Sequence, residues 1–162
     1  MKKRTICVTT GTRAEFGILN SVLKGIQKSK NLDLKLIVTG THLSNHHGQS
    51  IKEIKDQGFT KYHKIKINQK TDTNYQMSID LGNSIIEFSK AFKSLNPDIN
   101  LVLGDRDEML ASTIAAYHMN IPVAHIHGGD RSQGGIDEYN RHAMTKMSNI
   151  HFPATMKSYN RI

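Results

Sequence analysis

Two charged turns lie in the second half of the chain, and each directly follows a short apolar run. The first run, Leu101–Leu103, leads into Gly104-Asp105-Arg106, and the second, Ile121–Ile126, leads into His127-Gly128-Gly129-Asp130. Short apolar runs of this kind are typical of buried parallel strands. Turns that follow such strands meet at one edge of an open α/β sheet, where ligands bind. The residues that we expect to line one crevice there are Asp105, Arg106, His125, His127, Asp130, Asp137, Glu138, Arg141 and His142.

These residue types suit proton transfer. The carboxylates of Asp105 and Asp137 can share the work of general acid and general base if their environments differ. His127 or His142 can do the same work near neutral pH. An equally weighted hypothesis makes Asp105 structural, either as a cap of the following helix or as an ion-pair partner of Arg106.

Histidine spacing raises the question of a metal. If one strand ran through both His125 and His127, the two rings would face the same side and could form a metal-binding pair. The pattern favours instead a buried core histidine at position 125. The adjacent His46 and His47 have neither a cysteine partner nor the spacing of a zinc-binding helix. We therefore expect no metal ion at these histidines.

A second possible anion site follows the first predicted strand, residues 4–10. The small polar turn from Gly11 to Gly17 leads into a helix with an apolar stripe, and helix N-termini attract anions. Arg13 can reach a phosphate from that position. The spacing alone favours an ordinary turn with a surface arginine.

The remaining chain alternates strands and helices with short connections. This alternation predicts an α/β fold, a Rossmann-like three-layer α/β/α domain whose mostly parallel sheet has the strand order 3-2-1-4-5-6. A stripe of Leu81, Ile85, Phe88, Phe92 and Leu95 is expected to face the core. The other predicted elements are strands at Leu32–Thr39, Tyr62–Ile67 and Ile150–Phe152, and helices at Ile51–Gly58, Glu108–Met119 and Asp137–Met147.

Composition narrows the class of protein. The 162 residues fit one domain, and no apolar run approaches the roughly 20 residues that span a bilayer. The net charge of +8 is spread over the chain without interleaved aromatic residues, which argues against a nucleic-acid partner. The first residues do not form a signal peptide, so we expect a cytoplasmic protein without a membrane partner. The single cysteine, Cys7, excludes an internal disulfide and is expected to be buried.

Five motifs carry a family resemblance. They are GTRAE at 11–15, TGTH at 39–42, PDINLVLGDR at 97–106, IPVAHIHGGD at 121–130 and IDEYNRHAMTKMS at 136–148. In this order they resemble the UDP-N-acetylglucosamine 2-epimerases, in particular the hydrolysing, sialic-acid-pathway branch. The resemblance implies one half of a glycosyltransferase-B-like fold. Residues 1–162 would form the amino-terminal Rossmann-like domain, with the carboxy-terminal nucleotide-binding domain absent from this chain; the final MKSYNRI, which looks like an interrupted helix, fits a truncation.

The resemblance also implies roles for single residues. Arg13 would approach the substrate diphosphate, Asp105 matches the active-site aspartate, and Asp137 matches a second acidic residue. Many relatives have glutamate where this chain has His127, so His127 either takes over an acid/base role or leaves it to the two aspartates. The further substrate-binding candidates are Arg106, Arg141 and His142.

The implied reaction converts UDP-N-acetylglucosamine into N-acetylmannosamine and UDP without a metal or nicotinamide. It proceeds by removal of the C2 proton with loss of UDP, followed by addition of water. Relatives of this branch are often homodimers, and some act on UDP-2,4-diacetamido sugars. Because a fold does not fix a function, the same sequence could also be a non-catalytic sugar-nucleotide-binding module or a glycosyltransferase subunit of this fold.

Overall fold

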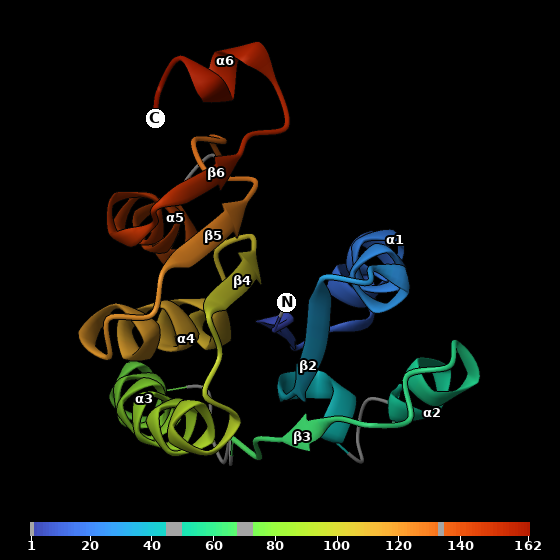
Figure 1. The fold of residues 1–162 in the computed structure, drawn as a ribbon. Helices are drawn as coiled ribbons and strands as arrows, with labels where there is room; N and C mark the ends of the chain where they lie inside the picture. Colours follow the sequence, from blue (N-terminus) through green and yellow to red (C-terminus); the bar gives the residue numbers. More distant parts are fainter. Residues whose placement is uncertain (1, 45–49, 68–72, 133–134) are drawn as a thin grey trace.

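A single parallel sheet organises the protein (Figure 1). The computed structural model describes residues 2–44, 50–67, 73–132 and 135–162. Within these ranges, six strands follow the order β3-β2-β1-β4-β5-β6, and every neighbouring pair is parallel. The predicted strand order is therefore confirmed. The strands are β1 (Arg4–Thr10), β2 (Leu32–Val38), β3 (His63–Lys64), β4 (Ile99–Leu103), β5 (Val123–Ile126) and β6 (Ile150–Phe152).

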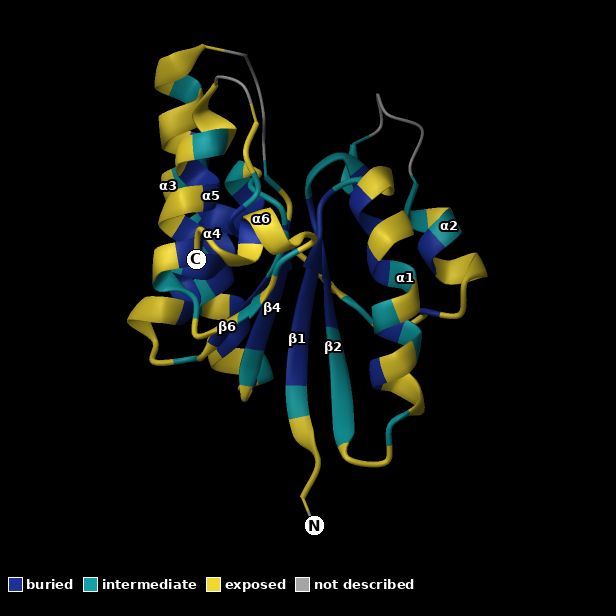
Figure 2. Cartoon of the chain, turned by 90° about the horizontal axis from the view of Figure 1, so that it is seen from above, coloured by how far each residue is buried: buried dark blue, intermediate teal, exposed yellow. Residues whose placement is uncertain are grey.

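Helices cover both faces of the sheet. In Figure 2, α1 and α2 lie on one side of the buried strands, and α3, α4 and α5 lie on the other. This arrangement confirms the three-layer α/β/α architecture. The helices are α1 (Arg13–Lys28), α2 (Ile51–Asp56), α3 (Asn74–Leu95), α4 (Asp107–His118), α5 (Ile136–Met147) and α6 (Met156–Tyr159), with a 3₁₀ turn η1 at Gly40–Leu43.

Alternating strand residues supply two separate cores. Ile6 and Val8 pack into the cluster beneath α1 and α2, whereas Cys7 between them packs into the cluster beneath α3 and α4. This alternation is what the pleat of a strand requires. Burial raises the pKa of the Cys7 thiol to about 12, which makes it the buried structural residue that the sequence predicted.

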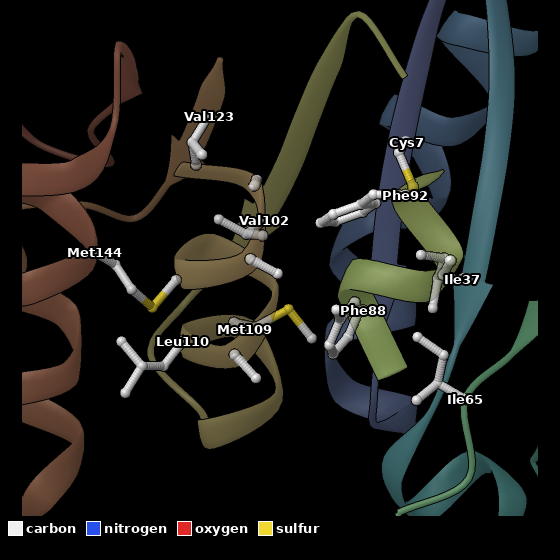
Figure 3. Packing of buried hydrophobic residues seen from close by; sticks show 14 residues of the cluster. Cys7, Ile37, Ile65, Phe88, Phe92, Val102, Met109, Leu110, Val123 and Met144 are labelled. Carbon is white, nitrogen blue, oxygen red and sulfur yellow. The ribbon is translucent and has the colours of Figure 1, made fainter. Parts of the chain in front are cut away.

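The apolar stripe of α3 faces the second of these cores, as expected. Phe88 and Phe92 are fully buried, and Figure 3 shows Phe88 next to Met109 of α4. Leu81, Ile85 and Leu95 are partly buried against the same cluster. The helix ends at Asn96, whose left-handed backbone precedes Pro97.

Two predicted strands are shorter than expected. The predicted strand Tyr62–Ile67 reduces to β3, because its ladder with β2 holds only the register pairs of His63 and Lys64 at the edge of the sheet. The predicted strand Ile121–Ile126 begins at Val123, because the Ile121 N–H still donates to Ala116 O at the end of α4. In the described ranges, no helix is both long enough and apolar enough to span a membrane.

Candidate active site

A cavity of about 400 Å³ lies at the carboxyl ends of β1, β4 and β5. Its volume falls within the range of small-molecule sites. The charged turns meet there, as the sequence predicted for an open α/β sheet. The lining residues are Thr12, Ala14, Glu15, Ile18, Leu103, Gly104, Asp105, Arg106, His127, Asp130, Asp137 and Arg141.

Asp105 follows β4 and forms an ion pair with Arg141 of α5. Neither structural role predicted for Asp105 is correct. The N-cap residue of α4 is Arg106, and the ion-pair partner of Asp105 is Arg141 rather than Arg106. Asp105 thus lines the cavity, and its carboxylate is held by Arg141 of α5.

Arg141 braces three segments around the cavity. Its side chain is largely buried, and its Nη1 donates to Asp130 O at 3.0 Å and to Glu138 Oε2 at 3.0 Å. Its Nη2 donates to Asp105. Burial lowers the pKa of Arg141, but a guanidinium still stays charged. One cation therefore holds the β4–α4 turn, the loop after β5 and the start of α5 together.

The two histidines of the His125-Ile126-His127 run have different environments. His125 is fully buried, and its Nε2 lies 2.7 Å from Gly104 O. Burial lowers the pKa of His125, so this ring is neutral and must donate from Nε2 to the carbonyl. The prediction of a buried core histidine is confirmed.

His127 lies outside the strand. β5 ends at Ile126, and His127 has a left-handed backbone with φ of 67°. The ring Nδ1 lies 2.8 Å from Asp130 Oδ2, and His127 lines the cavity. The condition for a metal-binding pair, one strand through both histidines, is thus not met.

The two acidic residues at the start of α5, Asp137 and Glu138, have different environments. Asp137 is exposed and lines the cavity. Glu138 instead accepts from the Ser132 N–H at 2.8 Å and from His142 Nε2 at 3.1 Å. The hydrogen bond from Ser132 N–H is the main cause of the lowered pKa of Glu138. Glu138 and His142 are therefore not among the residues that line the cavity, although the sequence placed both in the crevice.

Arg13 also lies away from the cavity lining. It is the first residue of α1, with 76% of its side chain exposed, and its Nη2 forms an ion pair with Glu53 Oε1 at 2.9 Å. The helix N-terminus itself is closed by a capping box between Thr12 and Glu15. The carboxylate of Glu15 accepts from the Gly11 and Thr12 N–H groups at 2.8 and 3.0 Å.

A buried acidic pair, Glu15 and Glu108, lies beside Arg106. The Arg106 Nε is 3.4 Å from Glu108 Oε2 and 3.8 Å from Glu15 Oε1. Burial, with a further contribution from Glu108, raises the pKa of Glu15. Neither glutamate was predicted from the sequence as a site residue. The Thr-x-x-Glu spacing at 12–15 is a capping-box signal that could have identified Glu15; no local pattern identifies Glu108.

The described residues contain no group of three or more histidine, cysteine, aspartate or glutamate side chains that could hold a metal ion. His46 and His47 lie outside the described residues.

Solved structures with the same fold define the class of protein. The chain superposes on a putative UDP-N-acetylglucosamine 2-epimerase from Listeria monocytogenes with a TM-score of 0.88 at 19% identity, covering 99% of this chain and 42% of that one. It superposes on the Neisseria meningitidis UDP-GlcNAc 2-epimerase bound to UDP-GlcNAc with a TM-score of 0.84 at 24% identity, covering 97% and 42%. The fold is therefore a Rossmann-like domain of the glycosyltransferase-B-like class.

Sequence comparisons identify the family. The pattern of the family described as UDP-N-acetylglucosamine 2-epimerase matches residues 24–162, and the chain belongs to this family. It is 43% identical over 159 residues to the UDP-N,N'-diacetylbacillosamine 2-epimerase (hydrolyzing) of Legionella pneumophila, covering 98% of this chain and 42% of the relative. It is 40% identical to the GDP/UDP-N,N'-diacetylbacillosamine 2-epimerase (hydrolyzing) of Campylobacter jejuni, covering 94% and 39%. The chain thus spans about two fifths of the length of these relatives.

Proposed function

We propose that this chain is the amino-terminal part of a hydrolysing 2-epimerase that acts on a UDP-2-acetamido sugar. The observation that carries this proposal is the meeting of Asp105, His127 and Asp137 on one cavity in a chain of this family. Three proton-transfer groups on one cavity suit a reaction that removes one proton from carbon and adds another. The cytoplasmic location and the homodimer expected from the sequence stay predictions.

The proposed reaction has two steps. In the first, a base takes the C2 proton of the sugar, the C1–O bond breaks, and UDP leaves with the bonding electrons, which gives a C1=C2 glycal. In the second, water adds its oxygen to C1 while C2 receives a proton on the opposite face. The net change is UDP-sugar plus water to the 2-epimeric free sugar plus UDP, with no oxidant or reductant.

The three groups offer different proton-transfer properties for these steps. The ion pair with Arg141 favours the ionised carboxylate of Asp105, which is the form that accepts a proton. His127 and Asp137 complete the set of possible acids and bases on the cavity. Arg106 lines the same cavity, and we assign it to the leaving diphosphate, where a cation stabilises the charge that develops.

The names of the relatives help to choose between two candidate UDP-sugar substrates. The two relatives at 43% and 40% identity are named for N,N'-diacetylbacillosamine, whereas the UDP-N-acetylglucosamine 2-epimerase of Neisseria meningitidis is 34% identical. We therefore favour a UDP-2,4-diacetamido sugar as substrate, and the UDP-N-acetylglucosamine predicted from the sequence is the second candidate. A role in forming sialic-acid-type sugars rests on the same comparison.

The relatives are longer than this chain. Because this chain spans about two fifths of them, we propose that a second domain supplies most contacts to uridine and diphosphate. Holding a substrate between two domains contributes much of the lowering of a reaction barrier. We expect the 162-residue chain alone to have little or no activity.

The test is release of UDP from each of the two UDP-sugars. It compares the 162-residue chain with a two-domain protein that carries this sequence followed by a second domain of the family. The two-domain protein should release UDP and yield the 2-epimeric free sugar, with a higher kcat/KM for the diacetamido substrate. Transfer of the sugar to an acceptor without epimerisation would identify a glycosyltransferase instead. Full activity of the 162-residue chain would contradict the need for a second domain.

A further inference from the structure

The short helix α6 is seated on the loop that follows β5. The Arg161 Nη1 donates to Gly129 O at 3.0 Å, and Gly129 has a left-handed backbone with φ of 74°. A Cβ added to Gly129 would lie 2.4 Å from Ser158 O, so only glycine permits this approach. The seating brings the buried hydroxyl of Ser158 against Asp130.

Asp130 accepts two hydrogen bonds, one on each carboxylate oxygen. Ser158 donates its O–H to Oδ1, and the second oxygen, Oδ2, lies 2.8 Å from His127 Nδ1. Burial alone would raise the pKa of Asp130, but the hydrogen bonds from Ser158 and His127 outweigh it and lower the pKa. An ionised carboxylate accepts and cannot donate, so Nδ1 of His127 must carry the proton.

The position of that proton decides what His127 offers to a ligand. A neutral imidazole protonated on Nδ1 has its lone pair on Nε2. His127 lines the cavity with 39% of its side chain exposed, and its Nε2 has no hydrogen-bond partner among the described residues. We propose that Asp130, held by Ser158, is a positioning residue that fixes His127 as the Nδ1-protonated tautomer and leaves Nε2 as the proton acceptor toward the cavity.

His125 provides the contrast within the same run. Its Nε2 donates to Gly104 O, so the two histidines carry their protons on opposite ring nitrogens. His127 follows the end of β5 with a left-handed backbone, and its ring contacts Asp130, whereas His125 lies within the strand. Neutral histidine free in water favours the Nε2-protonated form, so the tautomer at position 127 is the one that needs a partner.

The functional consequence rests on the proposed epimerase. His127 would accept a proton at Nε2 without turning its ring, and Asp130 would stabilise the imidazolium that forms. An acidic residue that orients a histidine in this way acts through the histidine and does not itself take the proton. His127 would then replace the glutamate that other members of the family are expected to use.

The test is NMR spectroscopy of the 162-residue chain labelled with ¹⁵N-histidine, at about pH 8, where an ordinary imidazole is neutral. Long-range ¹H–¹⁵N spectra report which ring nitrogen is protonated, and a His127→Gln variant assigns the signals. In the unmodified chain His127 should be mainly Nδ1-protonated and His125 mainly Nε2-protonated. Asp130→Ala should convert His127 to mainly Nε2-protonated, and Ser158→Ala should convert part of the population.

The control is Asp33→Ala, which removes a surface carboxylate whose partner is Lys35 at 2.9 Å and should leave both tautomers unchanged. His125 acts as the internal reference for folding in every spectrum. A mainly Nε2-protonated His127 in the unmodified chain overturns the proposal even if Asp130→Ala does not fold. An unchanged His127 tautomer in a folded Asp130→Ala variant also overturns the proposal. An unchanged His127 tautomer in Ser158→Ala overturns the role of Ser158.

Measurements of kcat and KM in the two-domain enzyme test whether the tautomer of His127 matters for catalysis. Asp130→Ala should lower kcat by ~10²–10⁴-fold, because a histidine in the other tautomer cannot accept the proton at Nε2, with a smaller change in KM. An unchanged kcat overturns the catalytic part of the proposal. The NMR result does not depend on activity, so failure of the epimerase assignment and failure of the positioning assignment are distinguishable.

Discussion

The guanidinium of Arg141 on α5 donates to the carboxylate of Asp105 after β4, and the two residues are 36 positions apart in the chain. Both side chains are mostly buried, at 11% and 17% exposure. This ion pair fixes the orientation of Asp105 at the cavity and links the β4–α4 turn to α5. Asp105, the proposed base, is thus held in place by this ion pair, and a substitution of its side chain can test its role.

Asp105→Asn in the two-domain enzyme is the first such change. The amide has the size of the carboxylate and still offers an oxygen to Arg141, so substrate binding should change little. The lost proton acceptor should lower kcat by ~10²–10⁴-fold, measured as UDP release.

Asp107→Asn is the matched control for that variant. Asp107 lies two residues away and accepts from Asn140 Nδ2 at 2.9 Å, without lining the cavity. Its turnover should stay near that of the unmodified enzyme. A near-normal kcat for Asp105→Asn would mean that Asp105 is structural.

Substitution of Arg106 or Arg13 should change KM, whereas substitution of Asp105 should change mainly kcat. Each is expected to contact the substrate diphosphate already in the ground state, so replacement by alanine should raise KM. Arg106→Ala should also lower kcat, because Arg106 is proposed to stabilise the charge that develops on the leaving diphosphate. Arg106 already lines the cavity, whereas Arg13 must leave Glu53 to reach it. Because the ion pair of Arg13 is exposed, its loss should cost less than about 1 kcal/mol of stability.

The measurements are KM for each variant and the midpoint of urea unfolding. Glu53→Gln is the control, since it releases Arg13 without removing it and should therefore not raise KM. If Arg106→Ala raises KM and Arg13→Ala does not, the diphosphate role of Arg13 is wrong.

The sequence predicted the fold well because the fold depends on local and periodic patterns. The stripe from Leu81 to Leu95 and the apolar runs before Asp105 and His127 identify elements by period alone. The carboxyl ends of neighbouring parallel strands must then meet, which placed Asp105, Asp137 and His127 near one cavity before any contact was known.

Contacts within the site were less predictable for physical reasons. The partner of Asp105 depends on the packing of α5 against α4, and sequence spacing carries no information about it. The direction of His127 depends on the sign of one backbone angle, φ of 67°, and few non-glycine residues have a positive φ. The Glu15–Glu108 pair arises where α1 and α4 begin at neighbouring strands, so each glutamate alone resembles a helix-start residue.

The buried His42 should make stability depend on pH. Burial is the main cause that lowers the pKa of His42 from 6.5 to about 4, and the ring lies between Thr10 Oγ1 at 3.0 Å and Ser50 Oγ at 2.7 Å. Between these two pKa values the unfolded chain binds a proton that the folded chain does not. The stabilising contribution is therefore present above about pH 6.5 and is lost as the pH falls toward 4.

The corresponding experiment measures the free energy of unfolding in urea at about pH 7 and about pH 4.5. His42→Gln keeps polar atoms near both hydroxyls but does not titrate, so its stability should fall less over this range than that of the unmodified chain. Equal losses in both proteins would show that His42 does not carry this pH dependence.

Gly40 should tolerate no side chain, because the turn after β2 packs directly on the loop after β1. Gly40 has φ of 56°, and an added Cβ would lie 2.6 Å from Glu108 Oε1 and 2.8 Å from Gly11 O. The second contact is with backbone, which cannot turn aside as a flexible side chain can. Gly40→Ala should therefore destabilise the protein by about 2–4 kcal/mol, from backbone strain and overpacking together.

Gly25→Ala is the matched control for this substitution. Gly25 lies within α1, and an added Cβ there would meet nothing within 4 Å. Alanine at this position should stabilise the protein by about 0.5–1 kcal/mol, because glycine in a helix loses more backbone freedom on folding. Urea unfolding of both variants should thus show shifts of opposite sign. A Gly40→Ala variant as stable as the unmodified chain would mean that the two loops separate readily, and Glu108 would then have no fixed place beside Arg106.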